Sequence, residues 1–196
     1  MKQEQIEAYE AMVASRIAPG ELLVAETTPR KMDILHATMG LVGELLELLE
    51  PQSQENMDIE HAVEEAGDSL FYVVNLHRVV GIPMKWNYTP PYTMVEMFNP
   101  AGVIKLASDI LDCGKRLGIY GSDKKEHEDA LILCAERSVD FIFGIRWFLR
   151  VPEADRERFT LESLARANTI KLDKRFHNSG YSKKSALGRA DKNGES

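Results

Sequence analysis

Apolar residues recur along most of the chain at spacings of three and four, which is the pattern of amphipathic helices, and no stretch alternates as a strand does. Prolines, glycines and polar loops divide this pattern into separate helices. We expect them at about 2–16, 30–50, 58–80, 100–117, 124–150 and 161–176. The stretch 82–98 holds three prolines and several aromatic residues, so it cannot form one regular helix. The chain is therefore predicted to be all-α.

The length of 196 residues suits one domain with a sizeable core. We expect a single all-α domain over residues 1–176. Residues 177–196 are polar and basic with little to bury, so we expect them to form a loosely held tail.

Acidic residues stand out in two of the expected helices. The segment MGLVGELLELLE places Glu44, Glu47 and Glu50 at three-residue spacing among leucines, which taken alone is the solvated face of an amphipathic helix. The next expected helix is apolar around most of its circumference, and its polar side chains form one stripe. That stripe consists of Glu64, Glu65, Asp68, Tyr72 and Asn75. Gly67 costs helix stability relative to alanine, which indicates a close approach by another backbone or a ligand.

Carboxylates on a buried helix must be paired, protonated or bound to metal. Residues 35–77 contain no lysine or arginine, so no cation nearby in sequence can neutralise them. A short connection places the two helices side by side and antiparallel, so that Glu44 and Glu47 face Glu65 and Asp68. Four carboxylates form a hard-oxygen site for Mg²⁺ or Mn²⁺, which indicates phosphate chemistry. The alternative is a polar seam with raised carboxylate pKa values and no metal.

The net charge and the composition of the chain indicate which classes of partner to expect. The net charge of −7 argues against nucleic acid as a main partner, although a bound divalent cation would still admit a small phosphorylated substrate. Cys113 and Cys134 form no CxxC pair and are interpreted as reduced thiols of a cytosolic protein. The sequence opens with no basic, apolar leader, and no apolar run reaches the length of a membrane span. We therefore expect neither secretion nor a membrane partner.

The acidic segments resemble a known family, the all-α nucleoside triphosphate pyrophosphohydrolases of the MazG type. The ExxE and ExxD signature of that family appears as Glu44-xx-Glu47 and Glu65-xx-Asp68. The segment NTIKLDKRFHNSGYS resembles the C-terminal N-x-x-K-L-x-x-R-[FY] element of the family, above all in phage-encoded and phage-like members. The remaining matching residues are His36, Gly40, Asn168, Lys171, Leu172, Arg175, Phe176, Gly180, Tyr181 and Arg189.

The resemblance implies a MazG-like helical bundle with a four-helix core and flanking helices. It implies hydrolysis of a (deoxy)nucleoside triphosphate to the monophosphate and pyrophosphate, by attack of water at the α-phosphorus. The expected ligands of Mg²⁺, or of Mn²⁺, are Glu44, Glu47, Glu65 and Asp68. The expected catalytic residues are Glu47, as the general base, with Glu44 and Lys171. The expected substrate-binding residues are His36, Asn168, Lys171, Arg175, Tyr181 and Arg189.

The same resemblance implies a nucleotide substrate as the partner and a homodimer or higher homo-oligomer. It also implies a cytoplasmic location, which is the host cytoplasm if the chain is phage-encoded. The aromatic residues Trp86, Tyr88 and Tyr92 either stack on a nucleobase or pin a long loop to the core.

The chain departs from the family pattern by a helical insertion at about 82–160. Its two helices are interpreted either as a decayed copy of the first pair or as an unrelated amphipathic hairpin. In the first case Asp109-xx-Asp112 stands in place of the ExxE pair. Arg137 then stands where Glu65 would be, which removes a second metal site. A duplicated core of this kind resembles the dimeric all-α dUTPases.

Other functions stay open at this point. One is a dUTPase or dCTPase with strict choice of base, because the insertion offers room for a base pocket. Another, of a different class, is a non-catalytic helical bundle that binds a partner or a nucleotide through solvated carboxylates. A di-iron carboxylate bundle is disfavoured because its Glu-x-x-His pairs are missing, and His61 precedes Glu64 rather than following it.

Overall fold

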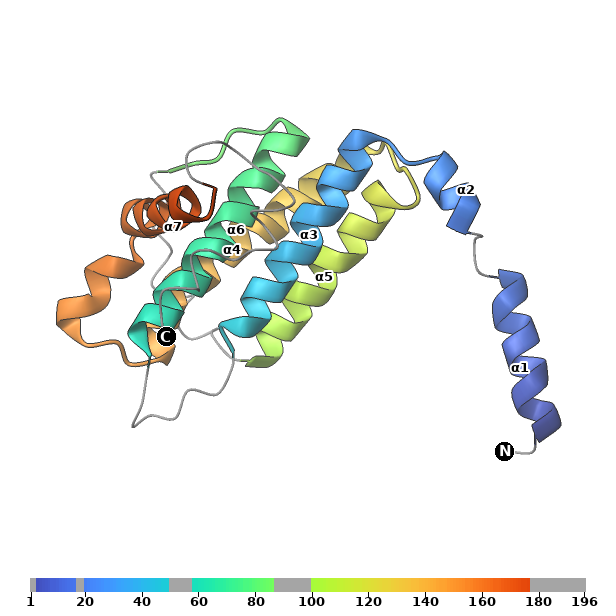
Figure 1. Ribbon diagram of the computed structural model, residues 1–196, viewed down its shortest axis with the longest axis horizontal. Helices are drawn as coiled ribbons and strands as arrows, with labels where there is room; N and C mark the ends of the chain where they lie inside the picture. The colour runs from blue at the N-terminus through green and yellow to red at the C-terminus, as the bar shows by residue number, and fades with distance from the viewer. Residues whose placement is uncertain (1–2, 17–19, 50–57, 87–99, 177–196) are drawn as a thin grey trace.

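The computed structural model describes residues 3–16, 20–49, 58–86 and 100–176, and within these ranges the chain is helical and contains no strand (Figure 1). The elements are α1 (Gln3–Arg16), α2 (Gly20–Ala25), α3 (Pro29–Glu47), α4 (Ile59–Val80), α5 (Pro100–Gly118), α6 (Lys125–Phe148), the 3-10 helix η2 (Glu153–Phe159) and α7 (Leu161–Phe176). The all-α prediction is confirmed. None of the described helices combines the length and the hydropathy that a membrane crossing requires.

The core lies between four long helices, α3 to α6, which pack as two antiparallel hairpins. Helix α3 contacts α4 and α5, and α6 contacts the same two helices, so the four form a closed ring around one core (Figure 1). Each helix contributes fully buried side chains to it, among them Leu41, Leu70, Ile110 and Ile142. The stretch that the sequence marks as an insertion therefore supplies half of the bundle.

Two glycines of α5 bring it close to α3. A Cβ atom on Gly114 would lie 2.6 Å from the Thr38 Oγ1 atom, and one on Gly118 would lie 2.5 Å from the Leu35 Cγ atom. Thr38 in turn donates a hydrogen bond to the Ile34 carbonyl at 2.8 Å, which satisfies its buried hydroxyl within α3. Any larger residue at the two glycine positions would push the helices apart.

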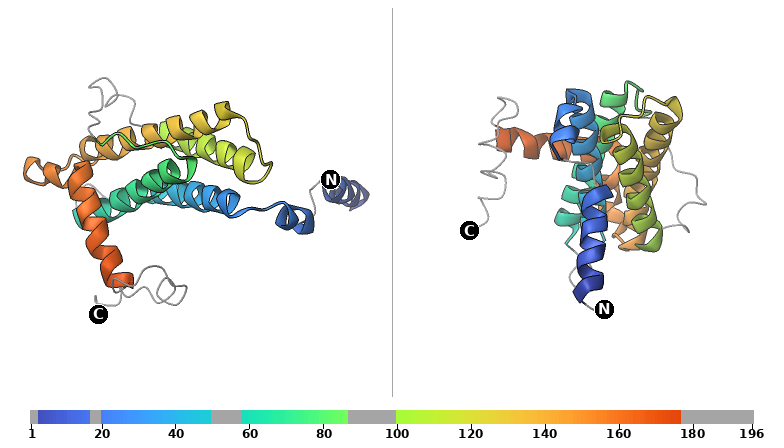
Figure 2. Two further views of the ribbon diagram at one scale, coloured as in Figure 1. Left: turned by 90° about the horizontal axis from the view of Figure 1, so that it is seen from above. Right: turned by 90° about the vertical axis from the view of Figure 1, so that its right-hand side faces the viewer.

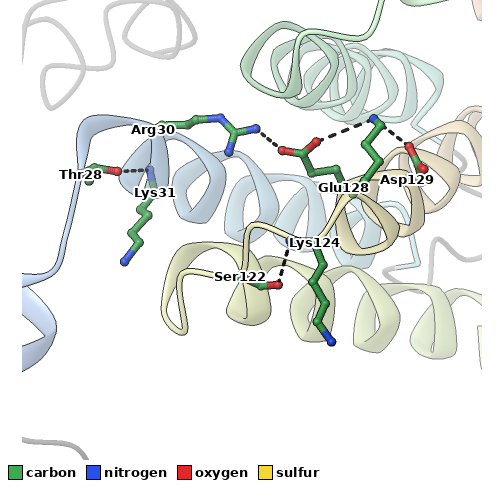
Figure 3. A network of polar contacts seen from close by, with 8 residues as sticks. Thr28, Arg30, Lys31, Ser122, Lys124, Glu128 and Asp129 are labelled. Carbon is green, nitrogen blue, oxygen red and sulfur yellow. Dashed lines mark hydrogen bonds and ion pairs between the residues drawn. The ribbon is translucent and has the colours of Figure 1, made fainter.

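Polar contacts gather where α3 and α6 begin, and one of them joins the two helices (Figure 3). Thr28 caps α3 by accepting a hydrogen bond from the Lys31 amide, and Pro29 occupies the first turn. Arg30 of α3 donates to Glu128 of α6 at 2.5 Å, and Glu128 also lies 3.7 Å from the Lys125 ammonium. The Arg30–Glu128 pair therefore links α3 to α6 at this end of the bundle.

Helix α7 crosses the bundle and packs on α4 (Figure 2). The 3-10 helix η2 precedes it and buries Phe159, while α7 itself buries Leu164 in the core. The amphipathic character of α7 thus places its polar residues beside α4, where the acidic stripe lies.

The structure differs from the sequence expectations at several element boundaries. Helix α2 and η2 were not predicted, because each is too short to show a periodic pattern. Helix α3 ends at Glu47 instead of 50, since Leu48 and Leu49 form a turn and Glu50 lies outside the described residues. Helix α6 ends at Phe148 because Arg150 adopts a left-handed φ of 52°.

Helices α1 and α2 extend away from the bundle (Figures 1 and 2). None of the side chains described in them is buried. The bundle proper therefore begins at α3. The expected tail at 177–196 lies outside the described residues.

Candidate functional site

Three carboxylates of the expected metal site come together between α3 and α4. Oxygen atoms of Glu44, Glu47 and Glu65 all lie within 4.8 Å of one another. The Glu65 side chain is buried, Glu44 is half-buried and Glu47 is exposed. The cluster therefore runs from the core of the bundle to its surface.

The local charge density perturbs Glu44 strongly. Its pKa is raised from 4.5 to about 8, first by burial, then by a hydrogen bond with Glu65 and by the charges of Asp68, Glu65 and Glu47. These effects favour the protonated form of the Glu44 carboxyl. A proton and a metal ion are both attracted to such a cluster, because either one reduces the repulsion between its carboxylates.

Helix α7 provides the cation that the region around α3 and α4 lacks in sequence. The Lys171 ammonium donates a hydrogen bond to the Glu64 carboxylate at 2.9 Å and another to Asp68. Asn168 donates to the second Asp68 oxygen at 2.5 Å. Burial acts to lower the pKa of Lys171, but the hydrogen bonds and charges of Asp68 and Glu64 outweigh it, so the pKa is raised. Lys171 is therefore a charged partner of two carboxylates.

Gly67 marks the crossing of α4 and α7. A Cβ atom built there would lie 3.4 Å from the Asn168 Cβ atom and 3.5 Å from the Leu164 carbonyl oxygen. Helix α7 therefore passes beside Gly67, but not so closely that glycine is required there. The distances are ordinary van der Waals contacts, so the site has room for a methyl group.

An aromatic pair covers the α3 side of the cluster. The ring of Tyr72 meets His36 edge to face, with ring centroids 5.8 Å apart. A Cβ atom on Gly40 would lie 2.3 Å from the Tyr72 ring, so glycine is needed there for the ring to lie against α3. Burial and then the charges of Glu44 and Asp68 raise the pKa of Tyr72. Its phenol is thus part of the electrostatic environment of the carboxylates.

The expected site residues are distributed as follows. Glu44, Glu47 and Glu65 are brought together, whereas Asp68 turns to α7 and bonds Asn168 and Lys171. His36 is exposed beside Tyr72. The half-buried Arg175 lies close enough for its charge to act on Tyr72. The remaining expected residues, Tyr181 and Arg189, lie outside the described residues, as do the aromatic residues Tyr88 and Tyr92.

Sequence reasoning missed the roles of Glu64 and His61. Glu64 is an acceptor for Lys171, and the His61 Nδ1 atom lies 3.4 Å from a Glu65 oxygen. Ligand atoms of His61, Glu64 and Glu65 form a second group within 4.8 Å of one another. The spacing of three and four residues from His61 was the available signal, since it places these side chains on one face of α4.

The second hairpin neutralises its carboxylates differently. Asp109 accepts hydrogen bonds from Lys105 at 2.8 and 3.0 Å, and Asp112 accepts one from Arg116 at 2.8 Å. Both cations belong to the same helix and lie four residues from their partners. The ExxE-like pair of α5 is therefore compensated locally, in contrast to Glu44 and Glu47 on α3.

Comparison with known proteins adds no assignment. No protein-family model matches the chain, and no match is found among the curated proteins or the solved structures.

Proposed function

We propose that the protein hydrolyses a (deoxy)nucleoside triphosphate to the monophosphate and pyrophosphate in a metal-dependent reaction. The observation that carries this proposal is the convergence of Glu44, Glu47 and Glu65 within 4.8 Å on two antiparallel helices. The pKa of Glu44 is raised to about 8, first by burial and then by a hydrogen bond with Glu65 and the charges of neighbouring carboxylates, and a divalent cation would lower it. The likeness of the ExxE and ExxD segments to the MazG type supports the choice of reaction.

The donor set fits a hard divalent cation. Three carboxylates that lie within 4.8 Å of one another offer the oxygen ligands that Mg²⁺ or Mn²⁺ prefers. Glu44, Glu47 and Glu65 would hold the ion, with Asp68 on the α7 side. A bound Mg²⁺ or Mn²⁺ would supply charge neutralisation for the triphosphate and acidify an attacking water.

The positions of the remaining residues support separate roles for them in proton transfer and in phosphate binding. Glu47 is the exposed member of the cluster, and as the general base it would be the carboxylate that water can reach. Lys171 now bonds Glu64 and Asp68. Its ammonium and the guanidinium of Arg175 would bind phosphate oxygens of the substrate.

A second candidate function is favoured by the same contacts of Lys171. Its ammonium and the Asn168 amide already satisfy both oxygens of Asp68. A polar seam that pins α7 to α4 needs no metal and no substrate. In that case the bundle is a non-catalytic binding or interaction module.

A nucleotide panel separates these candidates. The purified chain is incubated with individual ribo- and deoxyribonucleoside triphosphates and Mg²⁺, and pyrophosphate and orthophosphate are measured separately. We expect metal-dependent release of pyrophosphate that is lost in Glu47→Ala and retained in Asp112→Ala, a carboxylate of α5 matched in exposure. Circular dichroism confirms that both variants are folded. Absence of pyrophosphate with every nucleotide, with Mg²⁺ and with Mn²⁺, would favour the structural seam.

A further inference from the structure

Two arginines stack on one exposed tryptophan where α6 ends and η2 begins. The guanidinium carbon of Arg156 lies 4.5 Å from the centroid of the Trp147 ring, and that of Arg146 lies 5.5 Å from it. Arg146 also lies over the Phe143 ring, at 5.7 Å from its centroid. Such contacts hold a planar guanidinium against an aromatic ring without using its hydrogen-bond donors. The two cationic groups are therefore held close together at this turn.

Neither of these arginines has an acidic partner among the described residues. Arg156 donates a hydrogen bond from Nε to the Val151 carbonyl at 3.3 Å, which leaves its terminal nitrogens for other acceptors. The buried Nε atom of Arg146 has no hydrogen-bond partner, so the aromatic rings hold this guanidinium and no acceptor does. The neighbouring Arg158, in contrast, pairs with Glu60 at 2.6 Å. Two positive charges are thus uncompensated within a chain whose net charge is −7.

We propose that Arg146, Trp147 and Arg156 form an anion site that binds a phosphate group. A guanidinium presents its donors as a fork that matches two phosphate oxygens. A phosphate group carries close to two negative charges near neutral pH, which complements two arginines better than the single charge of a carboxylate. The exposed Arg150 adds a third positive charge to the same turn.

The site recognises phosphate in preference to an aromatic ring. The Trp147 side chain is 39% exposed, but two guanidiniums already lie over its ring. A nucleobase would have to displace one of them in order to stack there. The ligand is therefore bound through its phosphate, which a soluble phosphate compound or the headgroup of an anionic lipid can supply.

This site goes beyond the proposed hydrolase function. None of its residues belongs to the carboxylate cluster, and Lys171 and Arg175, to which we assign phosphate binding in that reaction, lie on α7. Arg146 and Trp147 lie on α6 and Arg156 on η2. The two proposals can therefore fail independently.

The fluorescence of Trp147 reads this site directly. The chain has two tryptophans, so Trp86→Phe leaves Trp147 as the only one. This variant is titrated with inorganic pyrophosphate in the presence of a chelator, which keeps divalent metal away from the carboxylate cluster. We expect a saturable change in emission that sodium chloride at matched ionic strength does not produce. Adding Arg156→Met should weaken binding about tenfold, because a charge-assisted hydrogen bond is lost.

Arg116→Met is the matched control, because Arg116 is an exposed arginine that pairs with Asp112 on α5. Arg116→Met and Lys171→Met should both bind pyrophosphate as tightly as the Trp86→Phe parent. Equal binding in Arg156→Met and Arg116→Met would overturn the proposal. A loss confined to Lys171→Met would overturn it as well, because the anion would then be bound on α7.

A second arm identifies the source of the phosphate. Vesicles of phosphatidylcholine, with and without phosphatidate, are sedimented together with the protein. Sedimentation that requires phosphatidate and is lost in Arg156→Met would assign the site to a lipid headgroup, whereas binding of pyrophosphate alone would assign it to a soluble phosphate compound. The titration of the Trp86→Phe parent leaves the site intact, so it decides the question even if Arg156→Met does not fold. No saturable response to pyrophosphate, together with no binding to phosphatidate vesicles, would contradict a phosphate site.

Discussion

The carboxyl group of Glu44 titrates in an unusual range for a single residue, and this has a consequence for stability. A carboxyl whose pKa is raised on folding, here from 4.5 to about 8, stabilises the fold fully below pH 4.5 and loses that contribution as the pH rises through about 8. Glu44→Gln should therefore unfold at higher urea concentration than the wild type at pH 9 but not at pH 5. We expect roughly 2 kcal/mol, discounted because the side chain is partly exposed.

Glu60→Gln is the matched control for this titration, measured in the presence of a chelator. The Arg158 hydrogen bond lowers the pKa of Glu60, so this carboxyl is ionised in both states from pH 5 upward. The effect of its removal should be the same at pH 5 and pH 9. An equal pH dependence in the two variants would show that Glu44 is not unusually protonated.

Lys171 gives a second test at the scale of one residue. Its side chain is 13% exposed and pairs with Glu64 and Asp68, so Lys171→Met leaves two carboxylates without their cation. We expect a loss of about 2 kcal/mol in the free energy of unfolding, below the range for a fully buried pair. Urea unfolding measures it, and added Mg²⁺ should restore part of the loss.

The comparison for Lys171 is Lys105→Met, which removes an exposed pair with Asp109 on α5. Surface pairs contribute at most about 1 kcal/mol. If the two variants lose the same stability, the α7 lysine is not a buried partner of the acidic stripe.

At this scale the sequence identified the residues better than their partners. Helical spacing and an antiparallel pairing of two helices predicted that Glu44 and Glu47 would face Glu65 and Asp68. Glu44, Glu47 and Glu65 do lie together, whereas Asp68 bonds to residues of α7. The absence of lysine and arginine from residues 35–77 led to the conclusion that no cation lies near these carboxylates. That conclusion holds only for neighbours in the sequence. Lys171 reaches Glu64 and Asp68 from α7, and only the tertiary crossing places it there.

At the scale of elements, the contact between α3 and α5 depends on small residues. Gly118→Ala should destabilise the bundle, since its Cβ atom would meet Leu35 at 2.5 Å. We expect a net cost of about 1–2 kcal/mol, after the gain in helix propensity from alanine is subtracted. Thermal or urea unfolding provides the measurement.

Gly43→Ala is the control on α3, because a Cβ atom there meets nothing within 4 Å. It should stabilise the protein by up to about 1 kcal/mol through helix propensity alone. A destabilising Gly43→Ala, or a neutral Gly118→Ala, would mean that the packing between α3 and α5 differs from the one described.

Periodicity predicted the long helices, and the expected start at about residue 30 is one residue later than the observed start of α3 at Pro29. Periodicity did not predict the short elements α2 and η2. Six residues of α2 and seven of η2 are fewer than the window in which a 3.6-residue period becomes visible. The sequence predicted that α6 ends at 150, whereas it ends at Phe148. The residue types at 149 and 150 do not indicate the left-handed backbone that Arg150 adopts there.

At the scale of the whole molecule, an apolar stripe on α3 is open to solvent. Met32, Met39 and Leu46 recur every seven residues, and their exposed fractions are 52%, 65% and 42%. We propose that a second copy of the chain covers this stripe, because heptad spacing lets two such helices pair with each other. Light scattering should then give a dimer or larger oligomer, and Met39→Asp should shift it toward the monomer. A monomeric wild type at micromolar concentration would contradict this.

The pairing of hairpins is the part of the fold that the sequence left open. Periodicity shows that α5 and α6 are amphipathic, but it does not show that they close a ring with α3 and α4. The structure shows the ring, and it shows that Asp109 and Asp112 are neutralised within α5. This difference between the hairpins supplies the internal control for the central proposal.

Binding of Mn²⁺ to the intact chain, followed by calorimetry or by the loss of its free electron paramagnetic signal, tests that proposal most directly. We predict binding by the wild type, loss of binding in Glu44→Gln combined with Glu65→Gln, and full binding in Asp109→Asn combined with Asp112→Asn. Absence of binding by the folded wild type, or equal loss in both double variants, would contradict a metal site between α3 and α4.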